Sequence, residues 1–162
     1  MAEFTRGEIE EALEAMDVLR DRSSKAGDWS IWAECLTEDV EFHDLIYGTY
    51  SGKQAVRDFV VRVHAPFPTL RYERQWSLID VDRAEIIFEQ QMILPEPEGY
   101  RGAPFAVDVW SRHRYAGDGL FSLKQDVTLS PDAAGKNFEA WAAAGGRFAA
   151  APLAPPNAKA DA

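Results

Sequence analysis

The stretch DVEFHDLIYGTYSG, residues 39–52, is typical of a short strand that runs into a turn. Val40 and Phe42 have the spacing of one buried strand face, and the same period of two places Asp44 on that face. The next residues, KQAVRDFVVRVHA, have the apolar spacing of a helix that ends before Pro66. The sequence therefore directs a carboxylate toward the protein interior, between a strand and a helix.

Two helices are predicted before this strand. Thr5 and Glu8 have the spacing of a capping box, and the apolar positions that follow repeat at helical intervals to about Ala26. Gly27 can end this helix, and Asp28 can cap a short second helix over WSIWAECL. With the helix after the turn, the N-terminal half is predicted to hold three helices.

Strands dominate the rest of the chain. Residues 70–80 and 83–94 alternate around the turn DVDR, and residues 105–115 and 120–129 around AGDG, which predicts two hairpins. Between them, PEPEGYRGAP at 95–104 reads as a Pro/Gly loop, placed where a lid could form. Helices first and strands later predict an α+β fold in which three helices wrap a curved antiparallel sheet that encloses an apolar cavity.

Composition limits the chain to one domain. Its 162 residues are 46% hydrophobic, enough for a single core, and we place this domain at residues 1–139. Residues 140–162 are rich in Ala, Gly and Pro. They are expected to form an unpacked tail, because they offer too little apolar area to offset the entropy lost on ordering.

Charge and missing motifs exclude several functions. Lys and Arg number 17 against 27 Asp and Glu, and the net charge of −10 disfavours nucleic acids and anionic membranes as partners. The sequence has no nucleotide-binding glycine motif and no serine-hydrolase elbow, so no cofactor is expected. Its three His residues lie far apart, so no metal site is expected, and the single Cys35 is predicted to be a small buried residue. The acidic N-terminus lacks a signal peptide, which predicts a cytoplasmic protein.

Three segments carry a family resemblance: AGDWSIWAECLTEDVEF, YGTYSGKQAVRDFV and RYAGDGLFSLKQDV. In order and spacing they resemble the nuclear transport factor 2-like superfamily, in the branch of the SnoaL-like polyketide cyclases and ketosteroid isomerase. The resemblance implies a cone-shaped barrel with an apolar cavity between the sheet and the first helix. It matches Asp44 to the strand-end acid that serves as general base in ketosteroid isomerase. The positions of that isomerase's two oxyanion-hole donors hold Ser111 and Arg20 here.

Polar residues are also predicted on the inner face of the stretch FAVDVWSRHRY, residues 105–115. The apolar phase of Val107 and Val109 continues into Ser111, His113 and Tyr115. Arg20 lies on the apolar stripe of the first helix and Asp44 at the end of its strand, so the predicted catalytic residues are Asp44, His113 and Arg20. The predicted substrate-binding residues are Tyr47, Phe59, Trp76, Phe88, Ser111 and Tyr115.

Each of these residues also has a purely structural interpretation. Asp44 can cap the turn, His113 can be a hydrogen-bonded core histidine, and Arg20 can extend from the edge of the stripe to water. Tyr47 can pack under the turn. Aromatic residues that share a strand face are first of all core residues.

Together these residues predict a cofactor-independent acid–base enzyme for a hydrophobic, aromatic small molecule. A lyase or dehydratase is the leading hypothesis, because Arg, His and Tyr side chains can together assist a departing oxygen. The resemblance extends it to deformylation or dehydration of a lignin-derived diaryl compound. The alternatives are an isomerase or polyketide-cyclase-like enzyme, and a non-catalytic protein for ligand binding or assembly. A homodimer or homotrimer is expected, with Trp110 on the exposed sheet face suited to an interface.

Overall fold

The computed structural model describes residues 4–156, and its helices agree largely with the predicted ones. The capping box of Thr5 and Glu8 opens α1, and Gly27 ends it in the left-handed conformation that glycine adopts at low cost. The predicted second helix is only one 3-10 turn, η1. The helices are α1 (Arg6–Ala26), η1 (Trp32–Cys35), α2 (Lys53–His64) and α3 (Pro131–Ala143).

Six strands form one open sheet in the order β2-β1-β6-β5-β4-β3. The two predicted hairpins are confirmed, and the turn after Asp44 adds a short edge strand. The prediction of a purely antiparallel sheet is wrong, because β1 pairs with β6 in parallel. These two strands are separated in the chain by α2, the first hairpin and the first strand of the second hairpin, so no tight turn forces them to be antiparallel. The strands are β1 (Leu36–Asp44), β2 (Gly48–Ser51), β3 (Arg71–Asp80), β4 (Glu85–Ile93), β5 (Ala106–Tyr115) and β6 (Phe121–Thr128).

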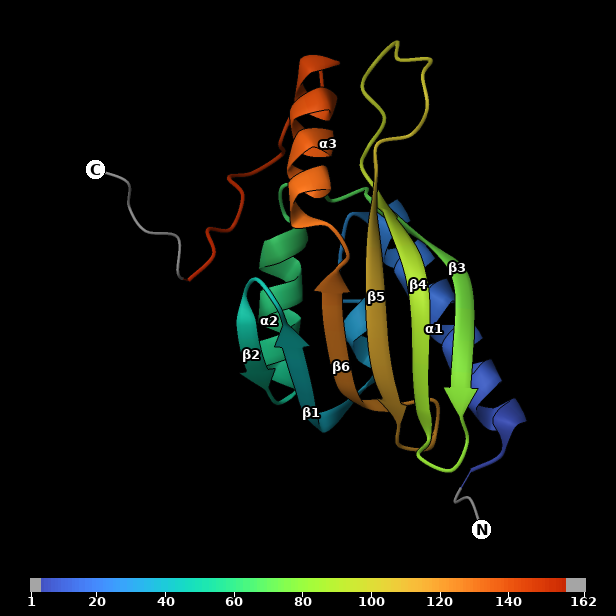
Figure 1. Cartoon of the computed structure of the whole chain (residues 1–162). Coiled ribbons are helices and arrows are strands. Elements are labelled where there is room, and N and C mark those ends of the chain that lie inside the picture. Colours follow the sequence, from blue (N-terminus) through green and yellow to red (C-terminus); the bar gives the residue numbers. More distant parts are fainter. Residues whose placement is uncertain (1–3, 157–162) are drawn as a thin grey trace.

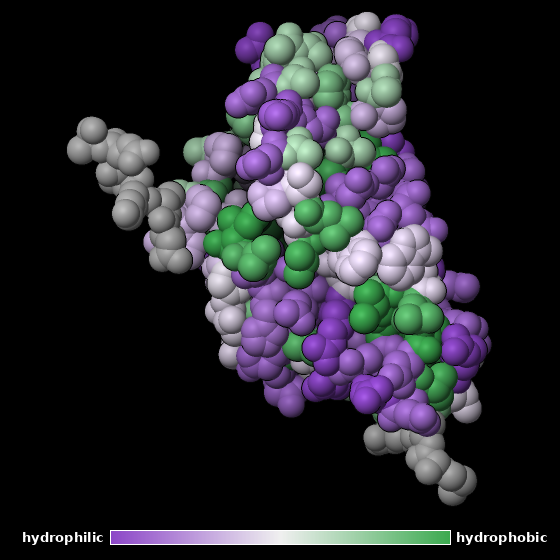
Figure 2. Space-filling model, in the orientation of Figure 1, coloured by the Kyte–Doolittle hydropathy of each residue, from purple (hydrophilic) through white to green (hydrophobic). Residues whose placement is uncertain are grey.

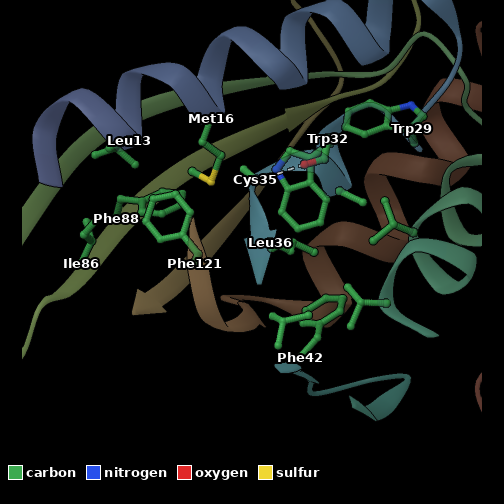
Figure 3. Packing of buried hydrophobic residues seen from close by; sticks show 14 of the residues in the cluster. Leu13, Met16, Trp29, Trp32, Cys35, Leu36, Phe42, Ile86, Phe88 and Phe121 are labelled. Carbon is green, nitrogen blue, oxygen red and sulfur yellow. Dashed lines mark hydrogen bonds between the residues drawn. The ribbon is translucent and has the colours of Figure 1, made fainter. Parts of the chain in front are cut away.

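The helices cover one face of the sheet (Figure 1). Helix α1 packs on β3 and α2 on β1, while α3 contacts β5 at one end of the sheet. Between α1 and the sheet lies an apolar core in which Leu13 and Met16 meet Phe88 and Phe121 (Figure 3). The α+β class and the curved sheet with helices on its inner face are therefore confirmed.

The C-terminal segment differs from the predicted tail. Helix α3 extends to Ala143, so the predicted domain boundary at 139/140 falls inside a helix. Trp141 is 1% exposed, packs against Phe67 and Phe148, and donates its indole N–H to the Pro95 carbonyl at 2.7 Å. One large aromatic residue thus anchors a segment whose composition suggested disorder. The last residues of the predicted tail, 157–162, lie outside the described residues.

Two β-bulges change which residues face the helices. The register of β3 shifts between Arg74 and Trp76, and that of β6 shifts between Phe121 and Leu123. Each bulge adds one residue, so the side chains beyond it change face relative to strict alternation. Trp76 is consequently 42% exposed on the outer face, where it packs edge-on against Trp110. The prediction of Trp76 as a cavity residue is therefore wrong.

The outer face of the sheet carries hydrophobic side chains among charged ones (Figure 2). Glu85 binds both Arg112 and Arg114 there, with its shortest contacts at 2.6 and 2.7 Å. Within residues 4–156, none of the helices combines the length and the apolarity needed to span a bilayer. The hydrophobic residues exposed on this face are Trp76, Leu78, Ile87, Trp110, Val127 and Leu129.

Candidate active site

A cavity of about 360 Å³ lies between the inner face of the sheet and the helices. Its volume is at the lower end of the range of about 300–1,000 Å³ that is usual for small-molecule sites. Aromatic and aliphatic side chains together form most of the wall, and charged groups from α1, β1 and β6 interrupt it. The aromatic residues are Trp29, Trp32, Phe42, Phe59, Phe67, Tyr72 and Phe138; the polar ones include Arg20, Asp44, Tyr47, His64, Gln90, Lys124 and Asp126.

Asp44 both caps the turn and lines the cavity. Its Oδ1 accepts the backbone N–H groups of Ile46 and Tyr47, each at 2.8 Å. Among the described residues, Oδ2 has no hydrogen-bond donor, so one carboxylate oxygen stays available to a ligand. Burial raises the pKa of Asp44, and the nearby Asp126 carboxylate adds to the rise. A carboxylate of this kind is a stronger proton acceptor than an exposed one.

A buried polar chain lies beside Asp44. Asp126 pairs in register with Asp44 across the parallel strands, and its Oδ2 forms a short ion pair with Lys124. Its Oδ1 accepts the Ser111 hydroxyl at 2.6 Å, and Ser111 accepts the Gln90 amide N–H at 3.0 Å. The Gln90 carbonyl oxygen has no partner within residues 4–156, although Gln90 is 1% exposed. This oxygen has almost no accessible surface, so its missing partner is a cost to the stability of the fold.

Lys124 places a positive charge in the apolar wall. Its Nζ lies 4.8 Å from the Phe42 ring centroid and 5.5 Å from that of Trp32. Burial lowers the pKa of Lys124, whereas the Asp126 carboxylate opposes this shift. The two aromatic faces and one carboxylate together stabilise a cation that is almost fully removed from water.

Arg20 brings a second cation from α1. It is 5% exposed, and its guanidinium carbon lies 5.2 Å from the Phe88 ring centroid and 5.5 Å from that of Tyr72. Its Nη1 contacts Asp17 at 3.3 Å, and Asp17 also binds Arg74. The predicted placement of Arg20 on the apolar stripe is confirmed, and its extension to water is not observed.

His64 and Tyr72 form a neutral polar pair in the same wall. His64 Nδ1 lies 2.8 Å from the Val60 carbonyl oxygen and must donate to it, so Nε2 accepts the Tyr72 hydroxyl at 3.0 Å. The His64 ring stacks on the Trp29 ring, with 3.9 Å between the two ring centroids. Burial lowers the pKa of His64 to about 4 and raises that of Tyr72, so both rings are neutral near neutral pH.

The structure divides the predicted site residues into three groups. Arg20, Asp44, Tyr47 and Phe59 line the cavity. Ser111 does not line the cavity itself but is hydrogen-bonded to two residues that do, Gln90 and Asp126. The remaining residues do not face the cavity: Trp76 lies on the outer face, and Phe88, His113 and Tyr115 lie in the core.

The prediction that His113 shares the cavity is wrong because the cavity adjoins the opposite end of β5. Val107 and Val109 line it, whereas His113 lies farther along the strand, between Phe88 and Phe121. There the side chains of α1 fill the space above the sheet (Figure 3). Tyr115 packs against Phe121 in the same core.

Sequence reasoning missed Lys124 and Asp126. In the stretch FSLKQDVT, strict alternation from Phe121 points Leu123 and Val127 inward, and both are hydrophobic. The bulge in β6 reverses this phase and points Lys124 and Asp126 inward instead. A register shift of this kind leaves no clear mark in hydrophobic periodicity.

The described residues contain no cluster of three or more His, Cys, Asp or Glu side chains placed to hold a metal ion. Cys35 is 4% exposed, as predicted, and its Sγ contacts the Trp32 carbonyl at 3.1 Å. Burial raises the pKa of its thiol to about 12, which leaves it protonated and unsuited to act as a nucleophile.

The family can be assigned from this fold and the matching sequence. Residues 9–123 match the SnoaL-like domain. The chain belongs to this family. That region extends from the first buried residue of α1 to β6 and so holds Arg20 and Asp44; Lys124 and Asp126 follow directly after it.

Solved structures show the same fold at low sequence identity. TerC, co-crystallised with polyporic acid, has a TM-score of 0.60 at 17% identity, over 81% of this chain and 98% of TerC. A SnoaL-like polyketide cyclase from Jannaschia, described as putative, has a TM-score of 0.57 at 15% sequence identity. The match covers 92% of this chain and 99% of the cyclase. A steroid delta-isomerase from Pseudomonas aeruginosa has a TM-score of 0.56 at 15% sequence identity. The match covers 88% of this chain and 96% of the isomerase. No curated protein matches the sequence significantly.

Proposed function

We propose that this protein is a cofactor-independent acid–base enzyme that removes a proton next to the carbonyl of a hydrophobic ring compound, as an isomerase or cyclase would. The observation that carries the proposal is the free Oδ2 of Asp44 in an apolar cavity that also holds two buried cations. Proton removal next to a carbonyl requires a base and a partner for the oxyanion that forms, and these groups supply both.

In this mechanism Asp44 is the general base. The backbone N–H groups of Ile46 and Tyr47 hold its Oδ1 and thereby orient Oδ2. When the α-proton leaves, negative charge develops on the substrate oxygen, and the Lys124 ammonium stabilises it at short range. Arg20 adds a second positive field from α1. In a cavity with little water, such charges act more strongly than they would in solvent.

The walls of the cavity favour a flat, unsaturated substrate. Trp29, Trp32, Phe59 and Tyr72 contribute aromatic rings to this wall. The crystallisation of TerC with polyporic acid supports a cyclic organic ligand for this cavity as well. We therefore propose a polycyclic aromatic carbonyl compound as the substrate class.

The lyase or dehydratase hypothesis receives less support from the geometry. It requires Arg20, His113 and a tyrosine together at a departing oxygen, and His113 and Tyr115 lie in the core. Arg20 and Lys124 can still stabilise a departing oxygen, so a lyase or dehydratase activity stays a prediction. The same holds for deformylation or dehydration of a lignin-derived diaryl compound. Simple ligand binding is the alternative that the same cavity allows.

Hydrogen–deuterium exchange tests the proposal. The protein is incubated in D₂O with β-tetralone and related ring ketones, and exchange of the α-protons is followed by NMR. We expect Asp44→Asn to slow exchange by about 100-fold or more. Asp39→Asn, an exposed aspartate on the same strand, should leave it unchanged and serves as the matched control. Equal exchange by the wild type and Asp44→Asn would contradict the assignment, and a lack of exchange by the wild type would favour binding.

We also propose that two copies of the chain associate through the outer face of the sheet. Six hydrophobic residues are exposed there, and the edge-to-face pair of Trp76 and Trp110 lies among them. The Glu85 cluster at the margin, with Arg112 and Arg114, can provide a polar rim. We propose a cytoplasmic location, where a small hydrophobic metabolite would be the partner.

A further inference from the structure

Lys124 differs from the other lysines that the structure describes. Its side chain is 8% exposed, whereas those of Lys25 and Lys53 are 76% and 27% exposed, and Lys136 is also exposed. Its amine lines the cavity, next to the faces of Phe42 and Trp32. A ligand in the cavity would therefore meet a primary amine in apolar surroundings, where lysine is most readily converted to its neutral, nucleophilic form.

Asp126 is positioned to exchange protons with this amine. Its Oδ2 contacts Nζ directly, and its Oδ1 is fixed by the Ser111 hydroxyl at 2.6 Å. Because Gln90 in turn donates to Ser111, three side chains hold the carboxylate in place. A carboxylate held beside a buried amine can accept its proton and later return it to a leaving hydroxyl.

We propose that Lys124 forms a covalent imine with the aldehyde or ketone carbonyl of an aromatic ring compound. The Lys124 ammonium gives one proton to Asp126, and the neutral amine attacks the carbonyl carbon to form a C–N bond. One of the two remaining N–H protons passes to the carbonyl oxygen, which gives a neutral carbinolamine. Asp126 returns its proton to this hydroxyl, the C–O bond breaks as water leaves, and the nitrogen lone pair forms the C=N bond of a protonated imine. One lysine ammonium and one carbonyl thus give one protonated imine and one water, with no oxidant or reductant.

This inference rests on the proposed function and specifies its chemistry. A protonated imine acidifies the neighbouring C–H bond more than a carbonyl does, and Asp44 lies in register with Asp126, two residue pairs beyond Phe42 and Lys124 and on the same face. Asp44 would then remove the proton and leave an enamine in place of an enolate. The effect of burial, which lowers the pKa of Lys124, favours the neutral amine that attack requires.

Reductive trapping tests the imine. The wild-type protein is incubated with naphthaldehyde and sodium cyanoborohydride, and the labelled lysines are identified by peptide mass spectrometry over time. Lys25 is the internal control, because it also pairs with a carboxylate, Asp21 at 2.6 Å, but is exposed. We expect Lys124 to be labelled about ten-fold faster or more, with saturation in aldehyde and inhibition by naphthylmethanol, which has the same ring system but no carbonyl.

The outcomes separate the two proposals. Labelling of Lys124 no faster than Lys25, or without inhibition by the alcohol, would overturn the imine. If ring-ketone exchange still depends on Asp44 in that case, the proposed function stands with Lys124 as a charge partner only. Selective labelling of Lys124 without any exchange that depends on Asp44 would support the imine and contradict Asp44 as the base. Lys124→Arg keeps the charge and must abolish the selective label.

Discussion

His113→Leu is expected to stabilise the protein and to leave its chemistry intact. His113 is fully buried between Phe88 and Phe121, and neither ring nitrogen has a hydrogen-bond partner within residues 4–156. Burial lowers the pKa of His113 well below its usual value of 6.5, and the Lys124 and Arg20 charges lower it further. Leucine has a similar size and brings no polar atom into this core.

The size of the effect depends on pH. Removing a buried polar group that lacks a partner should stabilise the fold by about 1–3 kcal/mol at about pH 8, less any cost of repacking. Below pH 6.5 the unfolded chain binds a proton at His113 while the folded protein does not, so the wild type loses stability as pH falls. At about 1.4 kcal/mol per pH unit, this loss reaches about 2 kcal/mol near pH 5. The variant lacks this loss, so its advantage should grow by that amount.

Urea unfolding of both proteins at the two pH values measures this difference. Titration of His64 and Asp44 also changes stability with pH, but it occurs in both proteins and cancels in the comparison. His43→Leu, at a partly exposed histidine, should change stability by less than about 0.5 kcal/mol. A variant that is less stable than the wild type at both pH values would contradict this prediction and indicate a buried water bound to His113. Loss of ring-ketone exchange in a folded His113→Leu protein would restore His113 as a catalytic candidate.

Three further changes have defined outcomes. Trp141→Ala removes a buried ring and should destabilise the fold by about 3–5 kcal/mol in thermal or urea unfolding. Phe148→Ala, at a residue 46% exposed, should destabilise it much less, and equal effects would contradict the packing of α3. In the pH–rate profile, the rate of α-proton exchange should fall at acid pH as Asp44 becomes protonated, with an apparent pKa above 3.8. Asp126→Asn removes a negative charge beside Asp44 and should move this fall to lower pH; an unchanged profile would contradict the pairing of the two carboxylates. Trp110→Glu should convert a dimer to a monomer in light scattering, while Val18→Glu, at an exposed residue of α1, should not; a wild-type monomer would contradict the proposed interface.

The element order and much of the core follow from the amino-acid sequence alone. The capping box, the helical spacing of α1 and α2 and the alternation in both hairpins are local patterns, because each depends on neighbours only a few residues away. The same patterns placed Asp44 and Arg20 on inward faces, and both line the cavity. Composition failed at the C-terminus, where a single buried residue, Trp141, outweighs an Ala-rich background.

The position of the cavity and the charges that it holds depend on contacts between distant parts of the chain. Inward orientation was predicted correctly for Phe88, His113 and Tyr115, but α1 fills the space above them, and no periodicity reveals which part of an inner face is covered. Two bulges turned Trp76 outward and brought Lys124 and Asp126 inward, because one added residue reverses the side-chain phase of everything beyond it. The parallel pairing of β1 with β6 then set Asp44 beside Asp126, through hydrogen bonds between segments about half the chain apart. Local pattern therefore supplies the base, and long-range register supplies its partners.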